Sequence, residues 1–269
     1  MKDLQKKSTA LITGASSGLG ASFAVYLAQK GLSVFLTARR EDRLKAVCQK
    51  IEADGGSASY FAADMGSERE RELLYQKAIS RYNTIDFLIN NAGFGWYGYF
   101  EDMPWETARK MGEVNMTAVV HLTKLCLMGM RKNRHGHIIN IGSIAGGLPN
   151  QGIAMYSGSK AFMDAFTVSL YRELRGSGVA ASVMRLGPVK TEFYDQARNR
   201  KNGRSIPAEK HAISTERVNK ALWRLMNHSQ RAVYVPGWLM LSRYIEQAFG
   251  GIIDLLGPLL LKKGDKEKR

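Results

Sequence analysis

The stretch Thr13-Gly14-Ala15-Ser16-Ser17-Gly18-Leu19-Gly20 decides the fold, because it joins an apolar run to a helical run through a glycine-rich turn. Glycine lets the backbone approach a phosphate closely, and a helix N-terminus offers free N–H groups and the positive end of a dipole. The pattern predicts a loop for the pyrophosphate of a dinucleotide, although its spacing differs from the standard GxGxxG. A strand–helix turn without a ligand is the alternative. The expected contacts are Gly14, Ser16, Ser17, Gly18, Leu19 and Gly20.

Outward from this turn, short apolar runs alternate with helical runs along the chain. The alternation is typical of βαβ units with right-handed crossovers, and several runs are apolar throughout, as strands covered on both faces should be. We expect an α/β, Rossmann-like fold: a doubly wound, mainly seven-stranded parallel sheet with helices on both faces. The strands are predicted at residues 8–13, 33–38, 58–62, 85–90, 137–141, 179–186 and 231–235.

The domain organisation follows from the same pattern. No internal linker interrupts it, so residues 1–269 are predicted to form a single domain. Within this domain we expect residues 8–190 to form the dinucleotide-binding and catalytic core. Residues 191–230 are expected to form a substrate loop and helix, and residues 238–269 a C-terminal amphipathic helical extension.

The composition narrows the class of protein. The chain has 269 residues, of which 45% are hydrophobic, enough to bury a core. Its two cysteines, Cys48 and Cys126, lie far apart without a CxxC pair, which excludes a disulfide framework and speaks against a zinc site. We expect both to be buried on helices, no bound metal, and a reducing, cytoplasmic compartment. No apolar leader and no apolar run of about 18 residues is present, so neither a signal peptide nor a spanning helix is predicted.

The formal net charge is +15, from 39 basic and 24 acidic residues. Such a charge suits nucleic acid, an anionic membrane surface or a phosphorylated ligand. No nucleic-acid motif accompanies it, and we therefore expect no nucleic-acid partner.

The end of the second strand bears on the choice of cofactor. A carboxylate in this position usually binds a free ribose 2′-hydroxyl, but here Ala38 holds the place and Arg39 and Arg40 follow. Arginine pairs with phosphate through charge-assisted hydrogen bonds. The sequence therefore favours NADP(H), while Glu41 and Asp42, slightly further along, keep NAD(H) open.

Further motifs follow in a characteristic order. Asp64-Met65 comes after the third strand, Asn90-Asn91-Ala92-Gly93 after the fourth, Asn115 in the next helix, Ser143 after the fifth strand, and Tyr156 and Lys160 form a YxxxK pair. With the TGxxxGxG loop, this set resembles the short-chain dehydrogenase/reductase family over residues 8–191. The family usually has Pro-Gly after the sixth strand, whereas this chain has Gly187-Pro188.

The resemblance implies an NADP(H)-dependent oxidoreductase that transfers a hydride between nicotinamide and a carbonyl or alcohol. It implies that Asn115, Ser143, Tyr156 and Lys160 are catalytic. It adds cofactor contacts at Asp64, Met65, Asn91, Ala92, Gly93, Tyr156, Lys160, Val189 and Thr191 to those of Arg39, Arg40 and the glycine-rich loop. It also implies a homodimer or homotetramer. A non-catalytic NADP(H)-binding sensor or scaffold is the alternative.

Physical chemistry explains how the YxxxK pair would work. A free tyrosine has a pKa of about 10, and residues four apart share one face of a helix. An ammonium about 4 Å from a phenolate is worth roughly 4 kcal/mol at a dielectric near 20. We therefore expect Lys160 to lower the pKa of Tyr156 by about three units. Ser143 would donate a hydrogen bond to the substrate oxygen, and Asn115 would hold a water near the lysine.

Three segments are expected at the substrate end: residues 93–100, 144–151 and 191–214. The first is rich in aromatic side chains, and the third begins with Thr191 followed by Glu192-Phe193-Tyr194. Such a lining suits a bulky apolar carbonyl or alcohol, such as a lipid, steroid or aromatic ketone. Packing within the loop or against another subunit is the alternative.

The tail that begins at Trp238 lies beyond the last predicted strand and is not needed for the predicted sheet. Its apolar pairs recur at helical spacing, while Gly250-Gly251 and Gly257-Pro258 would weaken or break a helix. We expect one or two amphipathic helices that either cap the substrate mouth, pack between subunits, or lie on an anionic membrane through the basic end 262–269.

Overall fold

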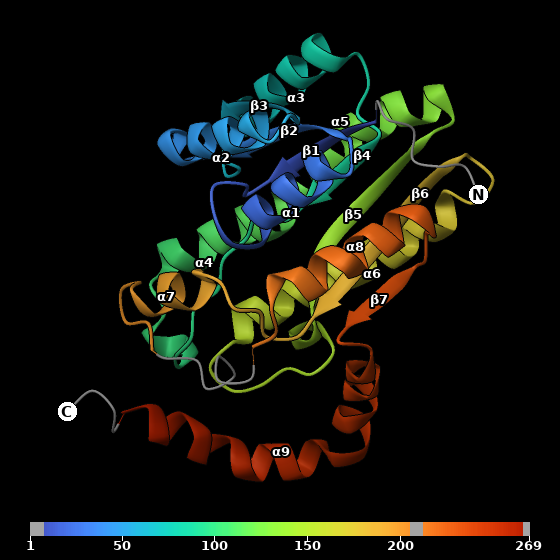
Figure 1. The fold of residues 1–269 in the computed structure, drawn as a ribbon. Helices are drawn as coiled ribbons and strands as arrows, with labels where there is room; N and C mark the ends of the chain where they lie inside the picture. The colour runs from blue at the N-terminus through green and yellow to red at the C-terminus, as the bar shows by residue number, and fades with distance from the viewer. Residues whose placement is uncertain (1–7, 205–211, 266–269) are drawn as a thin grey trace.

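The computed structural model describes residues 8–204 and 212–265, and a seven-stranded parallel sheet runs through them (Figure 1). The strand order is β3-β2-β1-β4-β5-β6-β7. The strands are β1 Thr9–Thr13, β2 Ser33–Ala38, β3 Ser57–Ala62, β4 Phe87–Asn90, β5 Gly136–Ser143, β6 Val179–Leu186 and β7 Ala232–Val235. The predicted doubly wound sheet is confirmed. The one boundary that moves at both ends is β5, which pairs with β6 along its full length.

Helices cover both faces of this sheet. One face carries α1 Gly18–Gln29, α2 Glu41–Ala53 and α8 Thr215–Asn227, and the other carries α3 Glu68–Tyr82, α5 Ala118–Asn133 and α6 Ala154–Glu173. Each set buries its apolar side against the strands. The two cysteines lie buried as expected, Cys48 on the first face and Cys126 on the second.

The chain changes winding direction between β1 and β4, which lie side by side although two strands and three helices separate them in sequence. In such sheets a crevice opens beyond the carboxyl ends of the strands at this point. Shorter elements gather at that edge: α4 Trp105–Gly112, α7 Phe193–Arg198, and the turns η1 Phe100–Asp102, η2 Glu113–Thr117 and η3 Ile144–Gly146.

Hydrogen bonds join the ends of β1 and β4. The Thr13 hydroxyl accepts the N–H groups of Asn91 at 3.0 Å and Ala92 at 2.9 Å. In return, the Asn91 side-chain amide donates to the carbonyls of Thr13 at 2.9 Å and Gly14 at 3.3 Å. A Cβ at Gly20 would lie 2.3 Å from the Gly14 carbonyl oxygen, so this position accepts no side chain. The glycine-rich loop therefore has a shape that the protein itself fixes.

The C-terminal extension is one helix, α9 Ser242–Asp265, after the turn η5 Gly237–Leu241. Of the one or two helices expected here, the structure has one, which continues through both Gly250-Gly251 and Gly257-Pro258. A single glycine costs a helix only about 1 kcal/mol, and the flanking leucines and isoleucines are compatible with a helix.

This helix lies apart from the sheet, along the lower edge of the view in Figure 1. Its large side chains are exposed: Phe249 by 54%, Ile252 by 54% and Leu255 by 76%. Within the described residues, no helix is both long enough and apolar enough to cross a bilayer.

The bonds at Thr13 generate a prediction for stability. Thr13→Val removes the acceptor of two N–H groups and should lower the free energy of unfolding by about 1–3 kcal/mol. Thr117→Val, at an exposed position in η2, is the control and should change it by less than about 0.5 kcal/mol. Urea unfolding measures both variants. Equal effects in the two would show that the Thr13 hydroxyl does not hold the strands together.

Candidate active site

A cavity of about 960 Å³ opens at the carboxyl ends of β1, β2, β4, β5 and β6. Most residues expected from the sequence line it, whereas Gly20 and Asn115 do not. The expected residues in its lining are Gly14, Ser16, Ser17, Gly18, Leu19, Arg39, Arg40, Asp64, Met65, Asn91, Ala92, Gly93, Ser143, Tyr156, Lys160, Val189 and Thr191.

The N-terminus of α1 forms one wall of this cavity. Its N-cap residue, Ser17, makes no side-chain capping bond, and no acid lies in the first turn. In α3, by contrast, Ser67 caps the helix by accepting the Glu70 N–H. Since the N–H groups at a helix start need acceptors, the uncapped start of α1 fits a phosphate group.

Arg40 has protein partners on this wall. Its guanidinium donates to Ser17 Oγ at 2.7 Å and to Ser16 Oγ at 3.2 Å, and it pairs with Glu192 at 3.3 Å. Glu192 also pairs with Arg43 at 2.8 Å. The two arginines lower the pKa of the Glu192 carboxyl, with the hydrogen bond from Arg43 as the largest cause. Arg40 is therefore already paired with an acid, Glu192, which the sequence did not indicate as its partner.

Tyr156 and Lys160 lie on α6 and both face the cavity, as their spacing requires. The Lys160 ammonium is 5.7 Å from the centre of the Tyr156 ring. The expected fall in the pKa of Tyr156 is wrong: burial raises it to about 12, and a hydrogen bond with Ser143 lowers it only in part. Desolvation of the buried phenolate is the largest cause of this shift.

Lys160 is buried, and its ammonium donates to the Ile141 carbonyl at 2.7 Å. Burial lowers the pKa of Lys160 to about 8, while the carboxylate of Asp164, one turn further along α6, raises it. Asp164 is held in place by Arg185, whose Nε is 2.9 Å from a carboxylate oxygen. The lysine thus changes protonation close to neutral pH.

Asn115 lies in η2, a turn of π-helix, and is fully buried behind the cavity. Its side-chain oxygen accepts the Phe94 N–H at 3.1 Å, and its amide donates to the Phe94 carbonyl at 3.0 Å and to Ser159 Oγ at 3.1 Å. In this geometry the side chain fixes the backbone that follows Gly93. The expectation that it holds a water stays a prediction.

The aromatic loop forms the outer part of the cavity. Phe94, Trp96 and Tyr97 are buried, and the segment after α7 packs on them. Trp96 Nε1 donates to the Lys201 carbonyl at 3.1 Å, and the Arg204 N–H donates to the Tyr97 carbonyl at 2.9 Å. The first and the third of the segments expected at the substrate end therefore form one wall. Residues 205–211 of the expected substrate loop lie outside the described residues.

Phe193 stands next to the tyrosine, with ring centres 5.6 Å apart. A Cβ at Gly95 would lie 2.8 Å from Phe193 Cζ, so the absence of a side chain at Gly95 makes room for this ring. The C-terminal extension supplies no described residue to the lining, so its described part does not support capping of the substrate mouth, one of the alternatives left open by the sequence.

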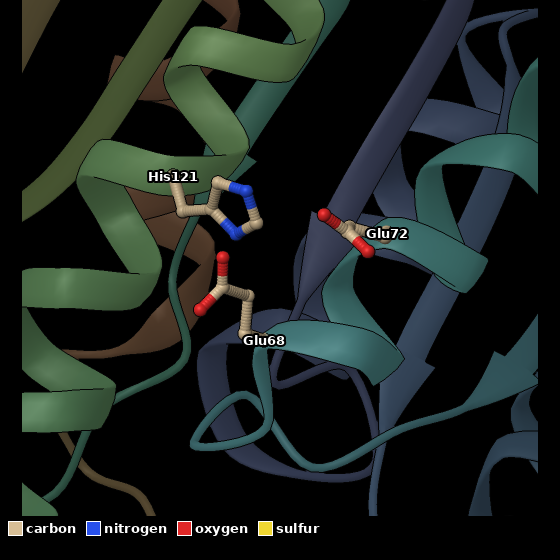
Figure 2. Close-up of side chains that lie close together, drawn as sticks. All are labelled: Glu68, Glu72 and His121. Atoms are coloured by element: carbon tan, nitrogen blue, oxygen red, sulfur yellow. The ribbon is translucent and has the colours of Figure 1, made fainter.

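A group of possible metal ligands lies away from the cavity, between α3 and α5. Figure 2 shows Glu68, Glu72 and His121 pointing toward one another, with ligand atoms within 4.8 Å. The protein supplies a cation here, because Arg71 Nε donates to His121 Nδ1 at 3.0 Å. Burial lowers the pKa of Arg71, while Glu68, Glu113 and Glu72 raise it. The cluster therefore fits an internal charge network.

The comparisons with known proteins agree with this geometry. The short chain dehydrogenase family pattern matches residues 8–202. The 3-oxoacyl-[acyl-carrier-protein] reductase of Buchnera aphidicola is 31% identical over 240 residues, which cover 86% of this chain and 94% of that protein.

Solved structures show the same fold. A short-chain dehydrogenase from Sphingobium yanoikuyae in complex with NADPH is 26% identical, with a TM-score of 0.79 over 92% of this chain and 95% of that one. A relative from Burkholderia phymatum in complex with NAD has a TM-score of 0.84 at 22% identity, over 92% of this chain and 95% of that one. The chain belongs to the short-chain dehydrogenase family and is an oxidoreductase that acts on CH–OH or C=O groups.

Proposed function

We propose that this protein is an NADP(H)-dependent carbonyl reductase or alcohol dehydrogenase for a bulky apolar substrate. The observation that carries the proposal is the convergence of Ser143, Tyr156 and Lys160 on one cavity beneath an aromatic wall. Phe94, Trp96 and Phe193 of that wall offer apolar surface to a lipid, steroid or aromatic ketone.

The residues present fit a dinucleotide. The uncapped start of α1 suits the pyrophosphate, and Lys160 and Thr191 line the part of the cavity expected to take the nicotinamide half. A bound nicotinamide would supply the hydride for reduction and accept it in oxidation. The protein's own part is to orient the substrate oxygen and to move its proton.

Tyr156 is suited to give that proton. With a pKa raised to about 12, its hydroxyl stays protonated at neutral pH and can donate to the oxygen of a carbonyl. The Lys160 ammonium lies near enough to stabilise the charge left on the ring oxygen in a buried site. Ser143, hydrogen-bonded to Tyr156, would donate to the same substrate oxygen.

The preference for NADP(H) rests on Arg39. This residue is exposed at the end of β2, lines the cavity and has no ion pair among the described residues, unlike Arg40. It is therefore available for a 2′-phosphate. A non-catalytic NADP(H)-binding protein is the second candidate, and turnover separates the two.

A first prediction tests the proton donor. Tyr156→Phe should lower the rate of ketone reduction by NADPH about 10²- to 10⁴-fold, because the general acid is lost. NADPH binding, followed by fluorescence, should stay nearly unchanged. Tyr171→Phe, on the same helix but outside the cavity lining, is the matched control. Normal turnover in Tyr156→Phe would reject the assignment, and no turnover in the unaltered chain with a panel of ketones would favour the non-catalytic candidate.

The pH dependence provides a second prediction. Reduction should slow as pH rises through about 8, where Lys160 loses its proton. Asp164 raises the pKa of Lys160, so Asp164→Asn should move this decline to lower pH. The measurement is kcat/KM from pH 6.5 to 9.5, with Asp54→Asn on the surface as control and thermal unfolding as a check of the fold. An unmoved decline in Asp164→Asn would contradict the role of Lys160.

The exposed apolar side of α9 supports a third proposal, contact with an anionic membrane. Phe249, Ile252 and Leu255 offer apolar surface, and residues 262–269 are mostly basic. The chain should float with anionic but not neutral vesicles, and replacing Phe249 and Leu255 by serine should abolish flotation. If the full chain never floats and light scattering instead shows a dimer that the serine variant loses, α9 contacts a second copy and the membrane proposal is wrong.

A further inference from the structure

The loop after α7 brings another arginine into the cavity. The Arg200 guanidinium stacks on Phe94, with Cζ 3.8 Å from the centre of the ring. Phe94 is itself held, because Asn115 bonds both its N–H and its carbonyl. Arg200 is thus positioned by packing on an aromatic ring rather than by an acid.

The hydrogen-bonding capacity of Arg200 is incompletely used. Its Nε is buried and has no hydrogen-bond partner in the described part of the chain, and the residue lines the cavity. A buried donor without an acceptor is costly, and more so when it carries charge. The arrangement is therefore suited to an anionic ligand that enters the cavity.

Arg39 adds a second positive charge to the lining of the same cavity. Burial lowers the pKa of Arg200, and the charge of Arg39 lowers it further. The two carboxylates of the lining that are closest in sequence to this loop already have arginine partners: Glu192 pairs with Arg40 and Arg43, and Asp195 pairs with Arg198. Among the side chains that the structure describes, neither Arg39 nor Arg200 has an ion pair. Two like charges in one cavity repel each other unless an anion lies between them.

We propose that Arg39 and Arg200 together bind one phosphate group, the 2′-phosphate of NADP(H), and that Arg200 is a specificity-determining residue for the cofactor. The inference rests on the proposed function. Arg39 follows the end of β2, and Arg200 comes from the loop after α7, so two separate segments supply the two charges. The free 2′-hydroxyl of NADH carries no charge, so the two arginines add nothing to the affinity for NADH.

The proposal also links the cofactor to the substrate wall. Arg200 immediately precedes Lys201, whose carbonyl accepts the Trp96 indole N–H. Arg204, in the same loop, bonds the Tyr97 carbonyl through its N–H. A phosphate held by Arg200 would therefore stabilise the position of the aromatic loop, and NADPH would do so where NADH would not.

The experiment measures the Kd of NADPH and of NADH by fluorescence titration in the full chain. Arg200→Met keeps an apolar chain on Phe94 but removes the charge. It should raise the Kd of NADPH about tenfold or more and leave the Kd of NADH nearly unchanged. Arg200→Lys should restore part of the loss. Arg198→Met, two residues away in α7 and outside the cavity lining, removes the same charge and should change neither Kd. Competition by 2′,5′-ADP against AMP, which differ only in the 2′-phosphate, should lose its selectivity in Arg200→Met.

The outcomes separate the two proposals. If the unaltered chain binds neither dinucleotide, the proposed function is wrong and this inference falls with it. If the chain binds NADPH but Arg200→Met weakens both cofactors equally, the arginine contacts the pyrophosphate and this inference alone is wrong. This inference alone is also wrong if Arg200→Met changes neither Kd. It is likewise wrong if Arg198→Met raises the Kd of NADPH as much as Arg200→Met does. Thermal unfolding shows whether Arg200→Met is folded, and the Arg200→Lys variant tests the charge at the same position.

Discussion

The Thr13 hydroxyl lies where β1 ends and accepts two backbone N–H groups from the end of β4. β1 and β4 are the neighbours between which the winding reverses, so their carboxyl ends bound the crevice. Asn91 closes the arrangement by donating to the carbonyls of Thr13 and Gly14. The position of the glycine-rich loop, and with it the start of α1, depends on these bonds. The other cavity walls are positioned relative to this fixed edge.

Charge is distributed unevenly over the cavity. On the wall at α1, Glu192 pairs with both Arg40 and Arg43, which ties the segment after β6 to the start of α2. Near the tyrosine, burial acts in opposite directions on the two titratable groups, raising the pKa of Tyr156 and lowering that of Lys160. Both shifts favour the neutral forms, as a low dielectric requires. The protein thus keeps a protonated phenol beside a lysine whose charge is only moderately stable.

The sequence was sufficient for the sheet and for most of the cavity lining. Buried strands are apolar runs of limited length, and the motifs follow strand ends, so topology alone brings Ser143, Tyr156 and Asn91 to one edge. It was insufficient where distance decides the chemistry. The four-residue spacing places Lys160 on the same side of the helix as Tyr156, but it does not fix how far the ammonium lies from the ring. Contacts made by irregular loops, such as Arg200 on Phe94, have no periodicity to reveal them.

Gly95 and Phe193 come from segments almost one hundred residues apart, yet the ring fills the space that a side chain at Gly95 would need. The ring in turn lies against Tyr156. The room available beside the Tyr156 ring is consequently governed by a pair of positions and not by one. A larger side chain at position 95 with a smaller one at position 193 would change the shape of this space, and with it the range of substrates that fit. The strands, the helices and the tyrosine itself would stay as they are.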